Sequence, residues 1–197
     1  MTTQKIILAS SSPRRIKILK DNGIEPIIIP PDVDEALPPN ISPHDAVLFL
    51  ALKKALQVET IALKRKLIDH IIISADTIVV FNNMIIGKPI NEEDAYNILD
   101  SLNGQAHTVL TGVCIIEVGT TRRKVFYEST RVFFKKYSKD ELLEYIKTPE
   151  PYDKAGGYAI QGAFMKYIDR IDGSYNNVVG FPWEKIQEQF SIHAEKL

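Results

Sequence analysis

Residues 5–15 read KIILASSSPRR, and this stretch predicts a strand that turns directly into a helix. The apolar run 5–9 has the length and composition of a buried strand. Ser12 stands where an N-cap is favoured, and Pro13 fills the first helical position, where its fixed φ fits and its missing N–H is not needed. We expect this helix to stop near Gly23. A buried strand joined to a helix by three serines indicates an α/β fold.

The rest of the chain continues this mixture of strands and helices. Strands are predicted at residues 26–31 and 71–75, and two alternating runs between 106 and 136 predict a hairpin around 119–121. Helices are predicted from Ser42 to about Leu67, from Asn91, from Ser138 to about Lys147 with Glu141 completing a capping box, and after Pro182. Residues 149–182 are expected to mix loops with short strands. Because no linker separates these elements, residues 1–197 are expected to form a single α/β domain with two lobes.

Composition narrows the class of protein. The 197 residues are 45% hydrophobic and 25% charged with a net charge of −1, so no basic stripe points to nucleic acid or a membrane surface. The single cysteine, Cys114, excludes an intramolecular disulfide and is expected to be buried in its apolar run. No apolar run reaches the length of a membrane span, and the first apolar run is too short for a secretory signal. We therefore expect a cytoplasmic protein.

The junction between the first strand and helix is a candidate anion site. The hydroxyl of Ser10, the guanidinium groups of Arg14 and Arg15, and the free N–H groups of a helix start would all suit a phosphate. The alternative is an ordinary N-cap followed by two solvated arginines, and the spacing leaves both open. The stretch is not a P-loop, because no glycine-rich run leads to Gly-Lys-Ser/Thr.

Asp76 and Thr77 are predicted at the carboxyl end of the strand 71–75, where ligands gather in open α/β sheets. The alternative is that Asp76 forms an Asx-turn where the strand ends. Lys88 lies in a tight Gly-Lys-Pro loop, a position that by itself indicates only a solvated lysine.

Two further residues stand out against their surroundings. Lys54 falls in the centre of an apolar helical stripe, so it must reach water or meet an anion, and the pattern by itself slightly favours reaching water. Gln161 lies in the glycine-rich stretch 153–162 and offers a donor and an acceptor suited to the edge of a base. The alternative for this stretch is a structural turn with Gln161 exposed.

Taken together and in order, these stretches resemble the Maf family of nucleotide pyrophosphatases. The matching stretches are residues 8–15, 34–35, 54–55, 74–77, 87–89, 107–113, 154–162 and 173–182. They cover nearly the whole chain, and their order is far more specific than any one of them. Two positions depart from the family pattern: Gly157 stands where alanine is common, and Phe181 where leucine is usual.

The resemblance implies a fold, an activity and a set of partners. The fold would be like that of inosine-triphosphate pyrophosphatases, an elongated mixed β-sheet flanked by helices with a deep cleft between two lobes. The activity would be hydrolysis of a nucleoside triphosphate to the monophosphate and pyrophosphate, by a homodimer that uses Mg²⁺ or Mn²⁺. The pairing of Asp-Thr at 76–77 with Ile-Gln-Gly at 160–162 resembles the branch that acts on dTTP and UTP. The alternative is a non-catalytic nucleotide-binding regulator of cell division.

The resemblance also implies roles for individual residues. Asp76 would be the proton acceptor, and with Glu35 it would lie on the metal side of the site. The other implied positions bind the substrate: Ser10, Arg15, Lys54 and Lys88 on the phosphate side, and Arg14, Thr77 and Gln161 in substrate choice.

Overall fold

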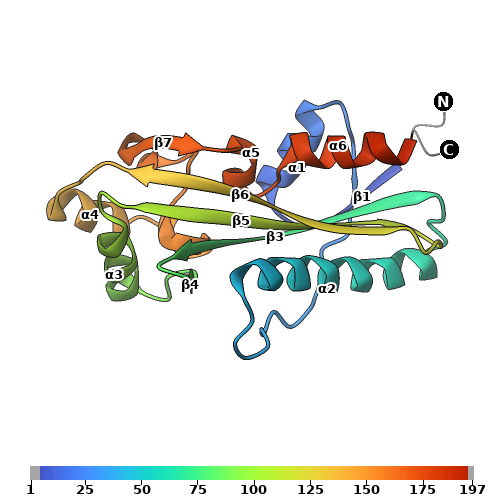
Figure 1. Cartoon of the computed structure of the whole chain (residues 1–197), viewed down its shortest axis with the longest axis horizontal. Coiled ribbons are helices and arrows are strands. Elements are labelled where there is room, and N and C mark those ends of the chain that lie inside the picture. Colours follow the sequence, from blue (N-terminus) through green and yellow to red (C-terminus); the bar gives the residue numbers. More distant parts are fainter. Residues whose placement is uncertain (1–4, 195–197) are drawn as a thin grey trace.

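In the computed structural model, which describes the backbone of residues 5–194 and the side chains of 5–189, the chain forms one seven-stranded mixed sheet (Figure 1). The strands are β1 Lys5–Ala9, β2 Ile27–Ile28, β3 His70–Phe81, β4 Met84–Ile86, β5 Ala106–Glu117, β6 Arg123–Phe134 and β7 Ile168–Asp172. Their order is β2-β1-β3-β5-β6-β7, with β4 paired to β3. Because β1 runs parallel to β2 and β3 while the other pairs are antiparallel, the predicted mixed sheet is confirmed.

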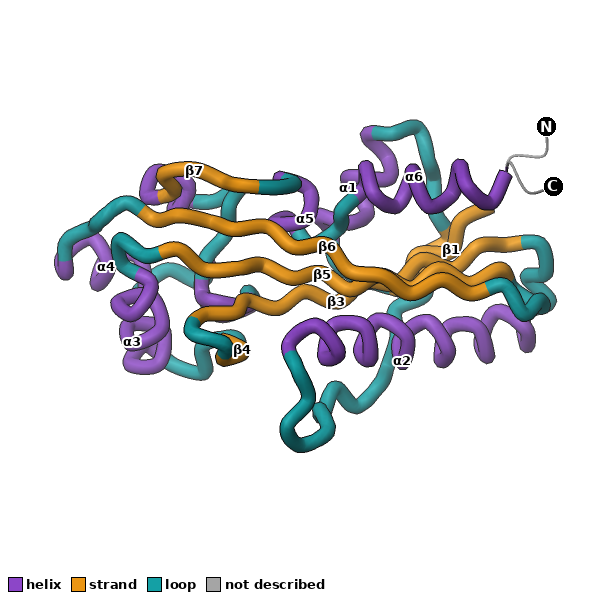
Figure 2. Tube along the Cα trace, viewed as in Figure 1, coloured by secondary structure: helices purple, strands orange, loops and turns teal. Residues whose placement is uncertain are grey.

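Helices cover both faces of this elongated sheet. They are α1 Pro13–Asp21, α2 Pro43–Lys64, α3 Glu92–Leu102, α4 Lys139–Ile146, α5 Tyr175–Val179 and α6 Trp183–Ala194. Figure 2 shows α2 along one face, α1 and α6 on the opposite face, and α3 with α4 at the far end. Apolar α2 side chains such as Ala55 and Val58 form a buried cluster with Ile72 and Cys114 of the sheet, so Cys114 is buried as predicted. None of the described helices is long and apolar enough to cross a membrane.

Local signals fixed most element boundaries. The helix α1 begins at Pro13, the capping box of α4 forms between Ser138 and Glu141, and Asn91 caps α3 through the N–H of Asp94. The strand predicted at 26–31 is shorter, only Ile27–Ile28. The region 149–182 differs more: it holds three 3₁₀ helices (Glu150–Asp153, Ala155–Gly157 and Ala163–Tyr167) besides β7 and α5. Its many glycines and prolines favour tight turns over strand pairing.

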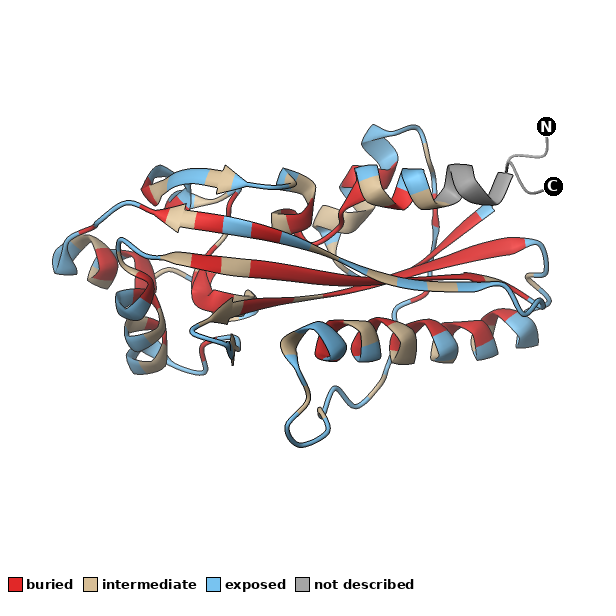
Figure 3. Ribbon diagram, viewed as in Figure 1, coloured by how far each residue is buried: buried red, intermediate tan, exposed pale blue. Residues whose placement is uncertain are grey.

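The prediction that a strand ends just before Asp76 is wrong, because β3 continues to Phe81. Residues 78–80, Ile-Val-Val, are β-branched and extend the strand, and they pair with β5 as far as Thr108. Figure 3 shows β3 and β5 as largely buried central strands. Asp76 therefore lies in the middle of a central strand, beside an opening in the sheet.

That opening lies between two strands on the same side of β3. Pairing with β1 ends at Ala9 and Ser74, and pairing with β4 begins only at Val79 and Ile86. Among the described residues, no strand pairs with residues 75–78 on this side, while β5 pairs with them on the other. The sheet thus has a gap beside Asp76 and Thr77.

Candidate active site

A cavity of about 650 Å³ opens at this gap in the sheet. Its volume is within the usual range for a small-molecule site. All nine predicted site residues line it: Ser10, Arg14, Arg15, Glu35, Lys54, Asp76, Thr77, Lys88 and Gln161. They come from α1, α2, β3 and four loops, so the fold gathers them from distant parts of the chain.

Lys54 links the two carboxylates of the cavity. Its Nζ lies 2.5 Å from Asp76 Oδ1 and 2.8 Å from Glu35 Oε1. Lys54 and Asp76 are each only 8% exposed, so Lys54 does not reach into bulk water as its pattern had favoured. The reason is tertiary: α2 packs across β3 and brings the ammonium onto the strand carboxylate, which offsets the desolvation of both charges.

Glu35 reaches this cluster from the exposed loop that precedes α2. Partial burial acts to raise the pKa of Glu35, but the hydrogen bond and charge of Lys54, with the charges of Lys88 and Arg15, lower that pKa below its usual value. Glu35 is therefore a carboxylate held in its anionic form by the surrounding cations.

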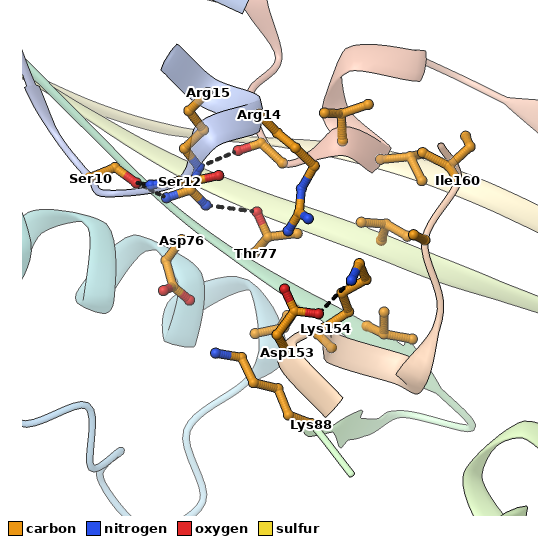
Figure 4. A pocket seen from close by; sticks show the side chains of 18 of the residues that line it. Ser10, Ser12, Arg14, Arg15, Asp76, Thr77, Lys88, Asp153, Lys154 and Ile160 are labelled. Carbon is orange, nitrogen blue, oxygen red and sulfur yellow. Dashed lines mark hydrogen bonds and ion pairs between the residues drawn. The ribbon is translucent and has the colours of Figure 1, made fainter. Parts of the chain in front are cut away.

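All three guanidinium nitrogens of Arg15 donate hydrogen bonds to other groups of the protein. Its Nε donates to the carbonyl of Gly180 at 2.9 Å, and its Nη1 donates to the carbonyl of Ala75 at 2.7 Å and to Ser10 Oγ at 3.2 Å. Its Nη2 donates to Thr77 Oγ1 at 3.3 Å (Figure 4). Burial lowers the pKa of Arg15, against the charge of Asp76. Arg15 thus ties β1, β3 and the end of α5 together at the gap.

The hydroxyl of Ser10 can still donate its proton into the cavity. Ser10 Oγ accepts from the N–H of Ser12 at 3.2 Å and from Arg15, so both lone pairs are used. No acceptor for the Ser10 hydroxyl is found among the described residues, which leaves a donor at the cavity. The Ser12 side chain makes no capping bond, so the first N–H groups of α1 also remain available to an anion, as predicted.

Arg14 and Lys88 are the least engaged cations of the cavity. Their side chains form no hydrogen bond or ion pair within the part of the chain that the structure describes, and Figure 4 shows both pointing into the cavity. The Lys88 loop is held in place by a backbone bond of 3.0 Å from the N–H of Gly156 to the carbonyl of Gly87. Gly156 has φ 72°, which allows this close approach.

Asp153 and Lys154, at the start of the glycine-rich stretch 153–162, also line the cavity, although the sequence assigned neither of them a role. Lys154 Nζ is paired with its neighbour Asp153 and donates to the carbonyl of Glu150 at 2.8 Å. The signal was present as adjacent opposite charges before a glycine pair, but such pairs are common on exposed loops.

The remaining wall of the cavity is largely apolar. Val79, Val109, Ile160 and Val178 line it, and Gln161 is exposed at its edge. The cavity therefore combines a cationic part with an apolar part, which suits an anionic ligand that carries a flat organic group.

Three kinds of comparison relate this chain to known proteins. A family model described as "Maf-like protein" matches residues 5–191. A protein of Caldicellulosiruptor saccharolyticus named dTTP/UTP pyrophosphatase is 46% identical over 183 residues, covering 93% of this chain and 92% of that protein. One of Desulforamulus reducens with the same name is 44% identical over 192 residues, covering 98% of each. Among solved structures, a nucleoside-triphosphatase (dITP/XTP pyrophosphatase) of Mycobacterium abscessus has a TM-score of 0.39 at 11% identity, covering 66% of this chain and 73% of that one.

Proposed function

The chain belongs to the Maf-like protein family, and from this premise we propose that it is a nucleoside-triphosphate pyrophosphatase acting on dTTP and UTP. It hydrolyses the bond between the α- and β-phosphates and releases the nucleoside monophosphate and pyrophosphate. The observation that supports this most is a single cavity that joins five cationic side chains to three carboxylates, among them Glu35 and Asp76.

The cationic side chains of the cavity neutralise the negative charge of the substrate. A triphosphate carries about four negative charges, and phosphoryl transfer depends mostly on positioning and charge stabilisation. Arg14 and Lys88 are the cations that no described side chain pairs, so they bind the phosphates directly. The hydroxyl of Ser10 and the first N–H groups of α1 add neutral donors. Arg15 and Lys54 contribute their charge while holding the site together.

Asp76 accepts the proton of the attacking water. Its Oδ1 is held by Lys54, and its Oδ2 has no hydrogen-bond partner among the described residues, so it is free to face a water. As the water oxygen bonds to the α-phosphorus, its proton passes to Asp76 and the bond to the bridging oxygen breaks. The pyrophosphate then leaves with its charge stabilised by Arg14 and Lys88.

Glu35 and Asp76 also fit a divalent cation such as Mg²⁺ or Mn²⁺. Mg²⁺ is usually held by one or two protein carboxylates together with substrate phosphates, and these are two oxygen donors bound to the same ammonium. Within the described residues no three His, Cys, Asp or Glu side chains form a metal site by themselves, so the nucleotide would supply further ligands. When bound, the cation neutralises phosphate charge and lowers the pKa of a bound water.

The apolar part of the cavity takes the nucleoside. We assign base selection to Thr77 and Gln161, which both line the cavity. The ranking of dTTP, UTP, CTP and GTP by turnover, compared between wild type and Gln161→Ala, tests this assignment. An unchanged ranking would remove Gln161 from base selection.

The activity itself is tested by identifying products. Purified protein incubated with UTP or dTTP and Mg²⁺ or Mn²⁺ should give the monophosphate and pyrophosphate, and a chelator should stop the reaction. Release of the nucleoside diphosphate and inorganic phosphate would contradict the proposal. Tight nucleotide binding without any product would favour the non-catalytic regulator of cell division instead.

Two further properties were expected, a homodimer from the resemblance and a cytoplasmic location from the sequence. We propose a homodimer and a cytoplasmic location, and the lone buried Cys114 is consistent with a reducing compartment. Light scattering after gel filtration tests the first; a monomer at working concentration would contradict it.

A further inference from the structure

A short chain of hydrogen bonds runs behind the cavity wall. Thr77 Oγ1 lies 3.0 Å from Thr111 Oγ1 on the neighbouring strand β5, and Thr111 Oγ1 lies 3.1 Å from the carbonyl oxygen of Asn177 in α5. Thr77 and Thr111 are directly paired across β3 and β5. Thr111 is fully buried and does not line the cavity, whereas Thr77 does.

The direction of this chain is fixed by its far end. A backbone carbonyl can only accept, so the single proton of the Thr111 hydroxyl goes to Asn177. The Thr77 hydroxyl must then be the donor to Thr111. The opposite direction would leave two acceptor oxygens facing each other at 3.1 Å in a fully buried position, without a proton between them.

Thr77 consequently faces the cavity only as an acceptor. Its proton is used by Thr111, and one of its lone pairs accepts from Arg15 Nη2 at 3.3 Å. One lone pair remains. Asp76 and Thr77 are consecutive in a strand and point to opposite faces, so Thr77 is turned from the Lys54 side toward the side of α5, where Val178 and Val179 line the cavity. An acceptor oxygen in the cavity wall suits the N–H of a heteroaromatic ring.

We propose that Thr111 is a positioning residue that fixes Thr77 as an acceptor and thereby makes the cavity favour uracil and thymine over cytosine. This inference rests on the proposed function. Uracil and thymine carry a donor N–H at ring position 3, whereas cytosine has an acceptor nitrogen there. Two acceptors cannot share a proton that neither carries, so cytosine leaves Thr77 unpaired.

The variant Thr111→Val tests this without changing any residue of the cavity wall. Loss of the Thr111 oxygen frees the Thr77 hydroxyl to turn and donate into the cavity. The ratio of kcat/KM for CTP to that for UTP should rise about tenfold, the effect of correcting one mispaired hydrogen bond. The conservative variant Thr111→Ser keeps the hydroxyl and should keep the wild-type ratio.

Thr130→Val is the matched control. Thr130 is a buried threonine on β6 that also holds the α5 region, accepting from Asn177 Nδ2 at 3.0 Å and donating to the carbonyl of Ser174 at 3.2 Å, but it has no bond to Thr77. Its loss should leave the CTP to UTP ratio unchanged even if the protein becomes less stable. If the effect came from a general loosening of α5, the CTP to UTP ratio would change equally in Thr111→Val and Thr130→Val.

The outcomes separate the inference from the proposed function. If wild type does not release pyrophosphate from UTP, the proposed function fails. If it does, and Thr111→Val keeps the wild-type ratio or shifts it only as much as Thr130→Val, the role of Thr111 is overturned. Should Thr111→Val not fold, Thr111→Ala removes the same oxygen with a smaller side chain. The same rise in the CTP to UTP ratio is then expected of Thr111→Ala.

Discussion

Lys54 on α2 and Asp76 on β3 form a buried ion pair of 2.5 Å at the one stretch of β3 that lacks a strand neighbour on its β1 side among the described residues. The pair links the packing of α2 to the geometry of the cavity. The Asp76 carboxylate thus serves both the proposed reaction and the packing of α2. Some mutations here should therefore lower turnover alone, and others should also lower the free energy of unfolding.

Asp76→Asn should remove chemistry. The amide keeps the shape of the side chain but cannot take the proton, so turnover should fall by about 10²–10⁴-fold. Binding of UTP, measured by calorimetry, should be unchanged or tighter, since one negative charge is gone. The exposed Asp34, which does not line the cavity, is the control position, and Asp34→Asn should keep wild-type turnover. Near-normal turnover in Asp76→Asn would remove Asp76 from the mechanism.

Lys54→Met should remove stability as well as activity. Without the ammonium, Asp76 remains buried next to Glu35 with no counter-ion between them, and the free energy of unfolding should drop by about 3 kcal/mol. Urea unfolding measures this. Lys53→Met, one position along α2, is the control, because among the described residues the Lys53 ammonium lies over the ring of the exposed Phe49 and forms no ion pair. Equal stability of the two variants would show that the ion pair is not a net contributor.

Gly112→Ala should displace α2 from the sheet. A Cβ at Gly112 would lie 2.2 Å from the carbonyl oxygen of Val47, a backbone atom of α2 that cannot turn aside. Overpacking of this kind destabilises by about 1–3 kcal/mol, and the shift should also weaken UTP turnover because α2 carries Lys54. Gly87→Ala, which meets no atom within 4 Å, should unfold at nearly the wild-type urea concentration. A fully active and stable Gly112→Ala would contradict the close helix–strand contact.

His107 should make stability depend on pH. Burial lowers the pKa of His107 from 6.5 to about 4, while its Nε2 lies 2.7 Å from the Tyr158 hydroxyl of the cavity wall. Between these values the unfolded chain binds a proton that the folded protein does not, so the free energy of unfolding should fall as pH drops from 6.5 toward 4. The loss should approach about 3 kcal/mol.

His107→Gln keeps a polar group near Tyr158 but does not titrate. Its unfolding free energy, measured over the same pH range, should fall less steeply than that of wild type. Parallel curves for the two proteins would mean that other groups cause the acid sensitivity.

The sequence alone determined the parts of this protein that depend on near neighbours. The strand and helix at Lys5–Asp21, the capping box at Ser138 and Glu141, and the hairpin of β5 and β6 follow from side-chain periodicity, capping and turn chemistry. Most candidate site residues stood out from local patterns with an alternative left open, and the family resemblance added Glu35 and gave Lys88 a role. The structure brings all nine into one cavity.

Only the tertiary structure decided what happens at the gap beside β3. The polar pair Asp76-Thr77 reads locally as a strand end, but pairing with β5 carries the strand past it to Phe81. The local pattern around Lys54 favours a side chain that reaches water. In the folded protein α2 packs across β3, and the Lys54 ammonium pairs with the carboxylate of Asp76 instead. Likewise the Thr77–Thr111–Asn177 chain joins residues up to 100 positions apart (177 − 77). Charge pairing and hydrogen-bond direction depend on distances between such segments, and local sequence patterns do not contain those distances.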